Sequence, residues 1–369
     1  MILNRKKLQA CLNSLSKVMA NNKKAIKPIY KNVQFIIASN KLSLYAMDGE
    51  HFITSLYDTI ENEDISFMVE YETINKLVSL SEVEEITFDF KETSIKIALG
   101  KSKYTLQYFL GQDFKFFIDD IEKKEQSLVL TETVENITSA ISFVSPVINN
   151  GSDQNKFKGI YFDGNFVAAD GAGVAVHYIS VSEGTFFVSK ESFSLISSMT
   201  KDTTVDIFTT GTHVIIESKF NKLIIPMLVQ EFPNYKNVID KVNKYTLSFT
   251  VNKEQFIKAC SRIKLFSDDS IKQHGLFKIS SDEITLTANS SNKEGEEIIE
   301  AIEIIISENP VEILVDFKRF IDYISNITSE TITLQFTEAV GKSQPILIKG
   351  SCLPFYIESS LVKRNLSLV

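Results

Sequence analysis

The stretch 157–179, FKGIYFDGNFVAADGAGVAVHYI, decides the fold because its pattern occurs three times along the chain. Apolar runs stand on both sides of the triplet DGN at 163–165, which is typical of the tight turn of a β-hairpin. A further apolar run follows a second turn at Asp170-Gly171. The stretch therefore predicts three consecutive antiparallel strands.

The same order of apolar runs and turns stands upstream and downstream. The second turn of the pattern begins at Asp48 in the first copy, at Asp170 in the second and at Asn289 in the third, 122 and then 119 residues apart. This period is about a third of the 369-residue chain. A period of this size indicates a repeated structural unit, and it predicts three domains, 1–122, 123–240 and 241–369.

Helical spacing of apolar residues predicts two short helices in each domain, packed on antiparallel sheets. Asn4 and Thr131 are the expected N-caps of the first helix in domains one and two. Linkers are expected at 118–127 and 238–244. Strands in runs rather than strict strand-helix alternation indicate the α+β class. Gly171-Ala172-Gly173 lacks the third glycine of a dinucleotide-binding loop.

The composition, 44% hydrophobic and 23% charged, is that of an ordinary globular protein. No apolar run approaches membrane-spanning length, and the N-terminus lacks a secretory h-region, so we expect a cytoplasmic protein with no membrane partner. Three cysteines without a CxxC pair and four scattered histidines predict neither a disulfide framework nor a metal site. No cofactor is expected.

The charge distribution is uneven. The formal net charge is −8, yet residues 1–47 contain nine Lys or Arg and no Asp or Glu. An acidic protein with one basic region can still bind a polyanion through that region.

Several short motifs carry a resemblance to a known family. They are Ala169-Asp170-Gly171, Glu231-Phe232-Pro233-Asn234-Tyr235, Arg262 to Asp268, Gly275-Leu276-Phe277 and the run Ile284 to Asn289. These motifs occur in this order along a chain with a threefold repeat. In both respects the chain resembles the bacterial DNA polymerase III beta subunit, the sliding clamp.

The resemblance implies a fold and a function. Two chains would associate head to tail into a dimeric ring of six domains, with helices lining the hole. The ring would encircle double-stranded DNA without sequence specificity and act as a processivity factor, not as an enzyme. Its partners would be the replicative DNA polymerase, the clamp loader and a second copy, and it would act at the nucleoid.

The resemblance also implies three groups of residues. Lys24 matches a DNA-facing position, and Lys17, Lys23, Lys27, Lys190 and Lys318 are added because they lie on or beside predicted lining helices. The peptide-binding pocket between domains two and three would comprise Phe157, Ala169, Gly171, Val174, Pro233, Val238, Pro345 and Ile357. The dimer interface would include Tyr104, Leu265 and Phe266.

Two departures from the family pattern concern the pocket. The family commonly has His-Arg after the glycine, where this chain has Ala172-Gly173. The family's chain usually stops at a short apolar tail, whereas this one continues past Ile357 to a basic end at Lys363-Arg364. We therefore expect an altered peptide preference.

Two alternatives compete with the clamp. An enzyme could use Asp48, Asp170 or Glu231 as a general base, although Asp-Gly at a turn more often serves the backbone conformation. The second alternative is a structural repeat protein that never binds DNA. The absence of Asp and Glu from residues 1–47 argues against this alternative.

Overall fold

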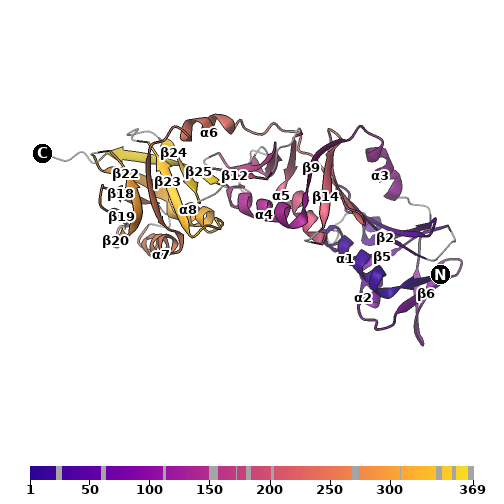
Figure 1. The fold of residues 1–369 in the computed structure, drawn as a ribbon. Helices are drawn as coiled ribbons and strands as arrows, with labels where there is room; N and C mark the ends of the chain where they lie inside the picture. Colours follow the sequence, from indigo (N-terminus) through magenta and orange to yellow (C-terminus); the bar gives the residue numbers. More distant parts are fainter. Residues whose placement is uncertain are drawn as a thin grey trace. The chain divides into compact units, whose positions relative to one another are not determined.

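The structure is a computed structural model that describes residues 1–21, 27–59, 64–110, 114–148, 157–171, 173–179, 184–200, 203–267, 274–307, 309–337, 343–350 and 355–364 (Figure 1). For 274, 343–344 and 355–364 it describes the backbone alone. The chain forms two compact units. Unit 1 comprises Met1–Thr138 and Val181–Val229, and unit 2 comprises Ser139–Ser180 and Gln230–Val369.

One order of elements, strand, helix, four strands, helix, three strands, occurs in the first two copies, and the third copy follows it with a fifth strand before its second helix. The first copy is β1 (Ile2–Asn4), α1 (Arg5–Asn21), β2 (Asn32–Ala38), β3 (Lys41–Met47), β4 (Phe52–Asp58), β5 (Ile65–Glu70), α2 (Tyr71–Ser79), β6 (Glu85–Phe90), β7 (Ser94–Leu99) and β8 (Ser102–Gln107). The second is β9 (Ser127–Thr133), α4 (Val134–Val144), β10 (Gly159–Phe162), β11 (Asn165–Ala169), β12 (Gly173–Tyr178), β13 (Phe186–Ser189), α5 (Lys190–Ser194), β14 (Thr204–Thr209), β15 (His213–Glu217) and β16 (Asn221–Pro226).

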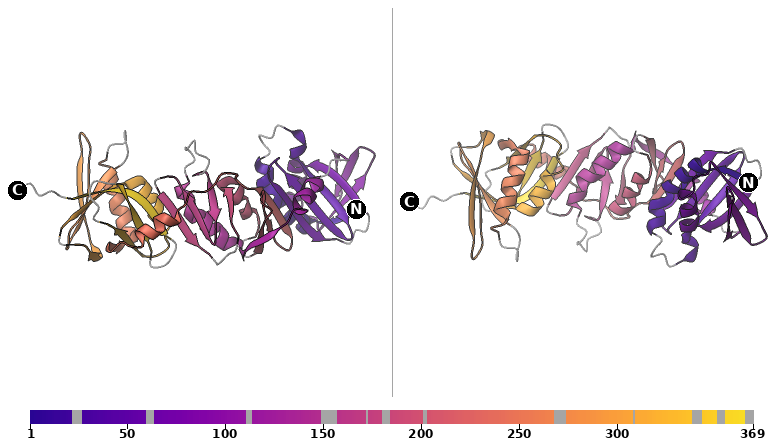
Figure 2. Two further views of the ribbon diagram at one scale, coloured as in Figure 1. Left: turned by 90° about the horizontal axis from the view of Figure 1, so that it is seen from above. Right: turned by 90° about the horizontal axis from the view of Figure 1, so that it is seen from below.

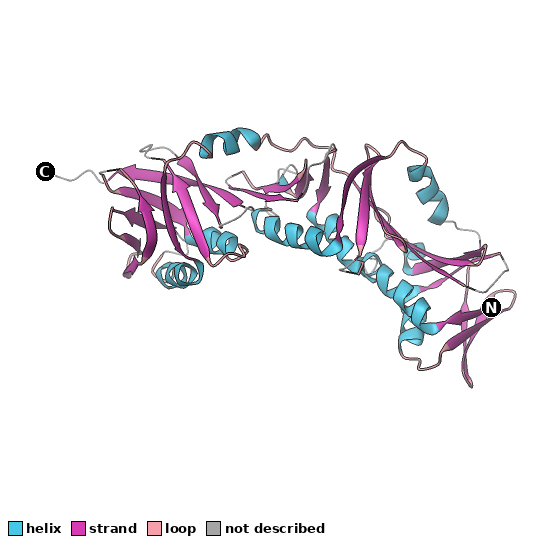
Figure 3. Ribbon diagram, in the orientation of Figure 1, coloured by secondary structure: helices cyan, strands magenta, loops and turns pink. Residues whose placement is uncertain are grey.

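The third copy has one additional strand. It is β17 (Leu247–Asn252), α7 (Lys253–Lys264), β18 (His274–Ile279), β19 (Ile284–Asn289), β20 (Glu294–Ile299), β21 (Ala301–Ile305), β22 (Val311–Asp316), α8 (Phe317–Ile324), β23 (Thr331–Phe336), β24 (Ser343–Lys349) and β25 (Phe355–Arg364). Between these elements lie the short 3-10 helices η2 (Pro28–Lys31), η3 (Ser145–Val147) and η5 (Leu195–Ser198) and the helices α3 (Phe114–Glu122) and α6 (Lys236–Val242). The predicted α+β class is confirmed (Figure 3).

Sheets continue from one copy of the pattern into the next. In unit 1 the order β5-β2-β3-β4-β16-β15-β14-β9 passes from copy one to copy two where β4 pairs with β16. In unit 2, β12 of copy two pairs with β25 of copy three. We call the β4–β16 contact the first joint and the β12–β25 contact the second joint. Each repeat therefore shares a sheet with its neighbour, and the predicted domain boundaries stay a prediction.

The turns have the backbone conformation that their residues predict. Gly49, Gly164 and Gly171 have φ values of 106°, 93° and 89°, in the region that favours glycine. Ser39 and Asn40 have φ values of 51° and 62°, as a two-residue hairpin turn requires.

The alignment of the third turn was wrong by one residue. The amide of Ser290 donates to Lys293 O at 2.8 Å, as Asp48 N does to His51 O and Asp170 N to Gly173 O. Ser290, not Asn289, is therefore the equivalent of the two aspartates, because hairpin register rather than residue similarity fixes the correspondence.

The helices pack by their apolar faces. Helix α1 buries Leu8, Leu12, Leu15 and Val18 against β3 and β4 and also contacts α2. Helix α7 packs on α8 and on the strands β17 to β20 (Figure 2). None of the helices in the described ranges is long and apolar enough to span a membrane.

Of the two predicted N-caps, one is confirmed and the other is wrong. Asn4 caps α1, since its Oδ1 accepts from Lys7 N at 3.0 Å. Thr131 is not a cap, because it lies in strand β9, and Thr133 Oγ1 accepts from Asn136 N at 3.3 Å instead. The predicted linkers also contain helices. Parts of 118–127 and 238–244 belong to α3 and α6, in which Ile118 and Val242 are buried.

Candidate functional site

The residues expected to form the peptide-binding pocket all belong to unit 2. Val174 is central among them. On β12 it pairs with Ala169 of β11 on one side and with Ile357 of β25 on the other. Val174 packs against the buried pair Val242 and Leu347, as does Val238, which is half-buried in α6. Strands from two repeats and a helix thus converge on one valine.

A small apolar cluster continues from Val174. Buried Val242 and Leu347 and half-buried Ile239 and Tyr245 pack in the same group. The backbone of Ile357 lies opposite Leu347, while its side chain is outside the described part of the chain. The cluster offers half-buried apolar side chains of the kind that can receive apolar anchors of an extended peptide.

The turn beside this cluster is covered by an aromatic ring. A Cβ built on Gly171 would lie 3.3 Å from the ring of Phe157, and the φ of Gly171 disfavours other residues. The structure therefore brings Phe157 and Gly171 together. Pro233 and Pro345 are half-buried, and Pro345 lies on β24 opposite Ser359. Ala172, the departure from the family pattern, lies outside the described residues.

A half-buried ion pair lies beside the same turn. Asp170 Oδ1 accepts from Gly173 N at 2.7 Å, and its Oδ2 accepts from the guanidinium of Arg319 on α8. The guanidinium carbon lies 6.0 Å from the ring centre of Tyr323. Gly173 leaves no room for a side chain, since a Cβ there would lie 2.6 Å from Tyr323 Oη. We call the Asp170–Arg319 contact the second polar link, because it crosses the second joint.

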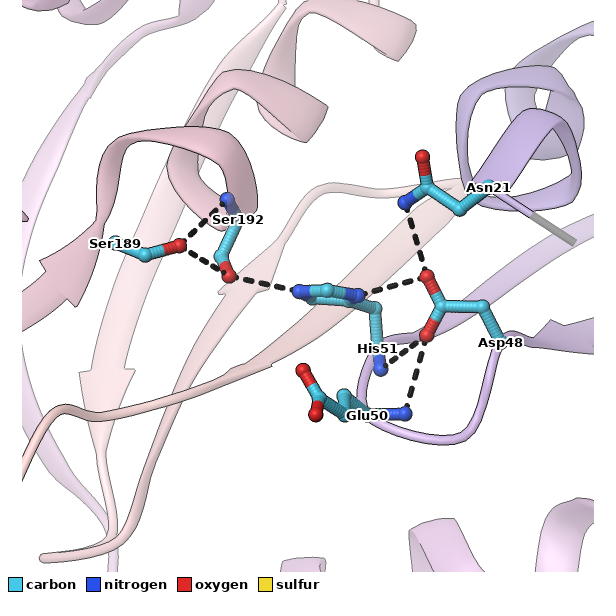
Figure 4. A network of polar contacts seen from close by, with 6 residues as sticks. All are labelled: Asn21, Asp48, Glu50, His51, Ser189 and Ser192. Atoms are coloured by element: carbon cyan, nitrogen blue, oxygen red, sulfur yellow. Dashed lines mark hydrogen bonds and ion pairs between the residues drawn. The ribbon is translucent and has the colours of Figure 1, made fainter. Parts of the chain in front are cut away.

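The first joint has its own polar contacts in unit 1 (Figure 4). Asp48 Oδ2 accepts from Asn21 Nδ2 at 3.0 Å and lies 2.8 Å from His51 Nδ1. His51 Nε2 lies 2.7 Å from Ser192 Oγ on α5. Because the carboxylate only accepts, His51 Nδ1 carries a proton, and in the neutral imidazole Nε2 accepts from Ser192. We call Asp48–His51–Ser192 the first polar link.

The hydrogen bonds determine the ionisation of Asp48. Burial alone would raise the pKa of its carboxyl, but hydrogen bonds from the His51 side chain, from Asn21 and from the His51 amide lower the pKa to about 2. Asp48 is therefore a weak base near neutral pH.

The order Asp-His-Ser is that of hydrolase triads, which makes the enzyme alternative worth testing against geometry. His51 and Ser192 are only 8% and 5% exposed. The Ser192 hydroxyl also accepts a hydrogen bond from Ser189 Oγ at 2.8 Å. A buried hydroxyl that has hydrogen-bond partners on both sides offers little access to a substrate carbonyl. The other proposed bases differ: Asp170 is ion-paired and Glu231 is exposed. Among the described residues no cluster of acidic, His or Cys side chains could hold a metal ion.

Four of the six lysines expected to face DNA are among the described residues, and these four lie on or beside helices. Lys17 is exposed on α1, and its ammonium donates to Ser197 of η5. Lys27 is exposed before η2, and Lys190 is the first residue of α5. In unit 2, Lys318 is exposed as the second residue of α8. Lys23 and Lys24 lie outside the described residues. In unit 1, Lys17 of α1 therefore lies next to η5, the short helix that follows α5 and its first residue Lys190.

Of the three expected interface residues, Tyr104 and Phe266 lie at edge strands of sheets, and Leu265 follows a helix. Tyr104, 41% exposed, is on β8, the last strand of the sheet β1-β6-β7-β8. Leu265 follows α7 and is 69% exposed. A Cβ on Gly295 of β20 would lie 2.8 Å from the ring of Phe266, so the aromatic ring rests on the glycine.

Sequence reasoning missed His51, Ser192 and Arg319, the partners of the two turn aspartates. One local signal was present: Ser192 and Arg319 are each the third residue of the second helix in their repeat.

The comparisons with known proteins cover the whole chain at the level of fold. Residues 242–352 match the family model of the DNA polymerase III beta subunit, C-terminal domain. Comparison with the curated protein sequences found no match. The solved structures below are similar across nearly the whole length of both chains.

The DNA polymerase sliding clamp from Pseudomonas aeruginosa superposes with a TM-score of 0.84 at 16% identity, over 98% of this chain and 99% of that one. A putative DNA polymerase III beta subunit from Eubacterium rectale gives 0.82 at 19% identity, over 98% of each chain. The Thermotoga maritima DNA polymerase III beta subunit gives 0.77 at 17% identity, again over 98% of each. The resemblance seen in the sequence is thereby confirmed: this chain has the bacterial sliding-clamp fold, and its last third matches the DNA polymerase III beta subunit family.

Proposed function

We propose that the chain is a DNA polymerase sliding clamp, a processivity factor without catalytic activity of its own. The observation that carries the proposal is the match of its fold to sliding clamps over 98% of its length, joined to the family match of residues 242–352. It would encircle duplex DNA and hold the polymerase and other partners by short peptides. We place its action in the cytoplasm, at the nucleoid.

Closure into a ring is supported by strand edges that stay unpaired in the described chain. In copies one and two, the strand after the second turn, β4 or β12, pairs with the last strand of the next copy, β16 or β25. The equivalent strand of copy three is β20, at a sheet edge, and the last strand of copy one is β8, also at an edge. Pairing β20 of one chain with β8 of another would repeat both joints head to tail.

The first joint predicts the register of that contact. Hairpin registers make Phe52 equivalent to Glu294, since they lie opposite Met47 and Asn289. The β7–β8 and β15–β16 hairpins make Ile224 equivalent to Thr105. Because Phe52 lies opposite Ile224, Glu294 would lie opposite Thr105.

Moving along this register brings complementary residues together. Gly295, with the Phe266 ring against it, would face Tyr104, and Glu296 would face Lys103. Both edges are charged: Lys101 and Lys103 are exposed at β8, and Glu294 and Glu296 are exposed on β20. The opposite signs favour this pairing over two like edges meeting.

Binding to DNA would be electrostatic and independent of sequence. Exposed Lys17, Lys27 and Lys318, with Lys190, present ammonium groups on or near helices, which suits phosphates and leaves base edges unread. Each phosphate neutralised should contribute about −0.9 to the slope of log affinity against log salt concentration. Lys23 and Lys24, which lie outside the described residues, are proposed as further phosphate contacts.

Peptide partners would use the cluster around Val174, with Phe157, Ala169, Gly171, Pro233, Val238, Pro345 and Ile357. The polymerase and the clamp loader are the expected owners of such peptides. Ala172 stands in the sequence where the family has a large polar side chain, and we therefore expect a peptide preference that differs from the family's usual motif.

The test is topological. Solution mass should be two chains and should decrease when the edge charges are broken, as in Lys103→Glu, and recover in the charge-reversed pair Lys103→Glu with Glu296→Lys. Lys244→Glu, an exposed loop position, is the control. Loaded protein should stay on closed circular DNA in high salt and slide off after linearisation. A mass of one chain under all conditions, or equal loss from circular and linear DNA, would refute the ring.

A further inference from the structure

The two joints within the chain contain polar links at equivalent positions. Each begins at the aspartate that opens the second turn, Asp48 or Asp170, and ends at the third residue of the second helix of the next copy, Ser192 or Arg319. At the first joint His51 stands between the two ends. The links differ in chemistry but join the same two places in the fold.

The third copy and the first copy contain the corresponding positions without the charge. Ser290 has the turn hydrogen bond of the two aspartates, with its amide 2.8 Å from Lys293 O. Thr73 is the third residue of α2, the second helix of copy one, as Ser192 and Arg319 are of α5 and α8. Both residues are half-buried. Within one chain they belong to different units.

We propose that Ser290 of one copy faces Thr73 of a second copy, at the place where the joints within the chain contain their polar links. This inference rests on the proposed ring. The joint between copies then has hydroxyl groups where the second joint has a carboxylate and a guanidinium. Two hydroxyls give a weaker contact than a charge-assisted hydrogen bond. The joint that has to separate for DNA to enter is thus the one whose polar link has no charged residue at either end, although its strand edges are charged.

The experiment builds the missing link. Ser290→Asp and Thr73→Arg together would reproduce the Asp170–Arg319 pair, and Asp fits this turn type, since it occupies it at two other places. The dimer dissociation constant is measured by mass photometry for the unmodified chain, both single variants and the double variant. In this cycle, any effect of the introduced guanidinium on Glu70, the hydrogen-bond partner of Thr73 in the same chain, cancels. Ser281→Asp with Thr93→Arg, two exposed turn positions, is the charge-matched control.

The expected result is a dissociation constant about tenfold lower in the double variant than the single variants together predict, since charge-assisted bonds contribute this much. The control pair should show less than about twofold coupling. A dimer whose double variant shows no more coupling than the control would overturn the facing of Ser290 and Thr73 and leave the ring intact. A monomer in the unmodified chain at every concentration would overturn the ring and this inference together.

Discussion

Replacing Asp48 with Asn should destabilise unit 1 by an amount that follows from its hydrogen bonds. Asp48 accepts from Asn21 Nδ2, from the His51 ring and from the amides of Glu50 and His51. These contacts hold the pKa at about 2, against an ordinary value of 3.8. A difference of nearly two units corresponds to about 2 kcal/mol of native-state stability. An amide in place of the carboxylate would also turn an NH₂ group toward one of these donors.

The pH dependence has a definite sign. Because the folded-state pKa is depressed, the contribution of Asp48 is fully present above about pH 4 and is lost as the pH falls toward 2. At pH 7 the Asp48→Asn variant should unfold at a temperature lower by about 4 to 8 °C, given a unit of fewer than 200 residues. At pH 2.5, which is still above the folded-state pKa, the difference between the two proteins should shrink to about a third of this value.

The assay is thermal unfolding monitored by circular dichroism, with amide hydrogen exchange to assign the transition to unit 1. Asp58→Asn is the matched control, since Asp58 is exposed at the end of β4 in the same sheet. It should change stability by less than about 0.5 kcal/mol. An Asp48→Asn protein as stable as the control at pH 7, or one with the same deficit at both pH values, would show that the carboxylate does not have the role assigned to it.

Three further predictions concern the other sites. Val174→Glu should reduce the affinity for a polymerase-derived peptide by more than tenfold, since a carboxylate would enter an apolar cluster; calorimetry measures it, and unchanged solution mass shows that the ring persists. Gly173→Ala should lower the free energy of unfolding by about 1 to 3 kcal/mol, because the added methyl group would meet Tyr323 Oη. A denaturation midpoint equal to that of the parent would contradict this packing argument. Lys318→Glu should weaken DNA binding and flatten its salt dependence; equal slopes in the variant and the parent would place Lys318 off the DNA path.

The sequence alone predicted the repeated hairpins, because the residues that specify a hairpin are close together in the sequence. Two-residue periodicity gives the strands, and turns such as Asp170-Gly171 and Ser39-Asn40 specify where the chain reverses. The helices α3 and α6 were missed because each is short, with nine residues in α3 and seven in α6. Length is what separates a helix from a loop in such a pattern.

The polar links could not be predicted from local patterns. Ser192 is 141 residues from His51, and Arg319 is 149 residues from Asp170. Nothing near Asp48 or Asp170 in the sequence specifies a partner at that distance. Because the two links use different residue types, knowing one link does not predict the other from the repeat. By contrast, Val174 and its neighbours were placed by resemblance, and the structure brings Val174, Ala169, Val238 and the backbone of Ile357 together.

The first joint has a consequence for synthesis of the chain on the ribosome. Strand β4 ends at Asp58, and its partner β16 ends at Pro226, 168 residues later. At translation rates of about 5 to 20 residues per second, the edge of β4 stays without its partner for roughly 10 to 30 s. During that interval a nascent chain exposes Phe52 and Ile53, which the finished protein buries. A neighbouring ribosome on the same message holds an identical open strand, so pairing between nascent chains competes with completion of the fold.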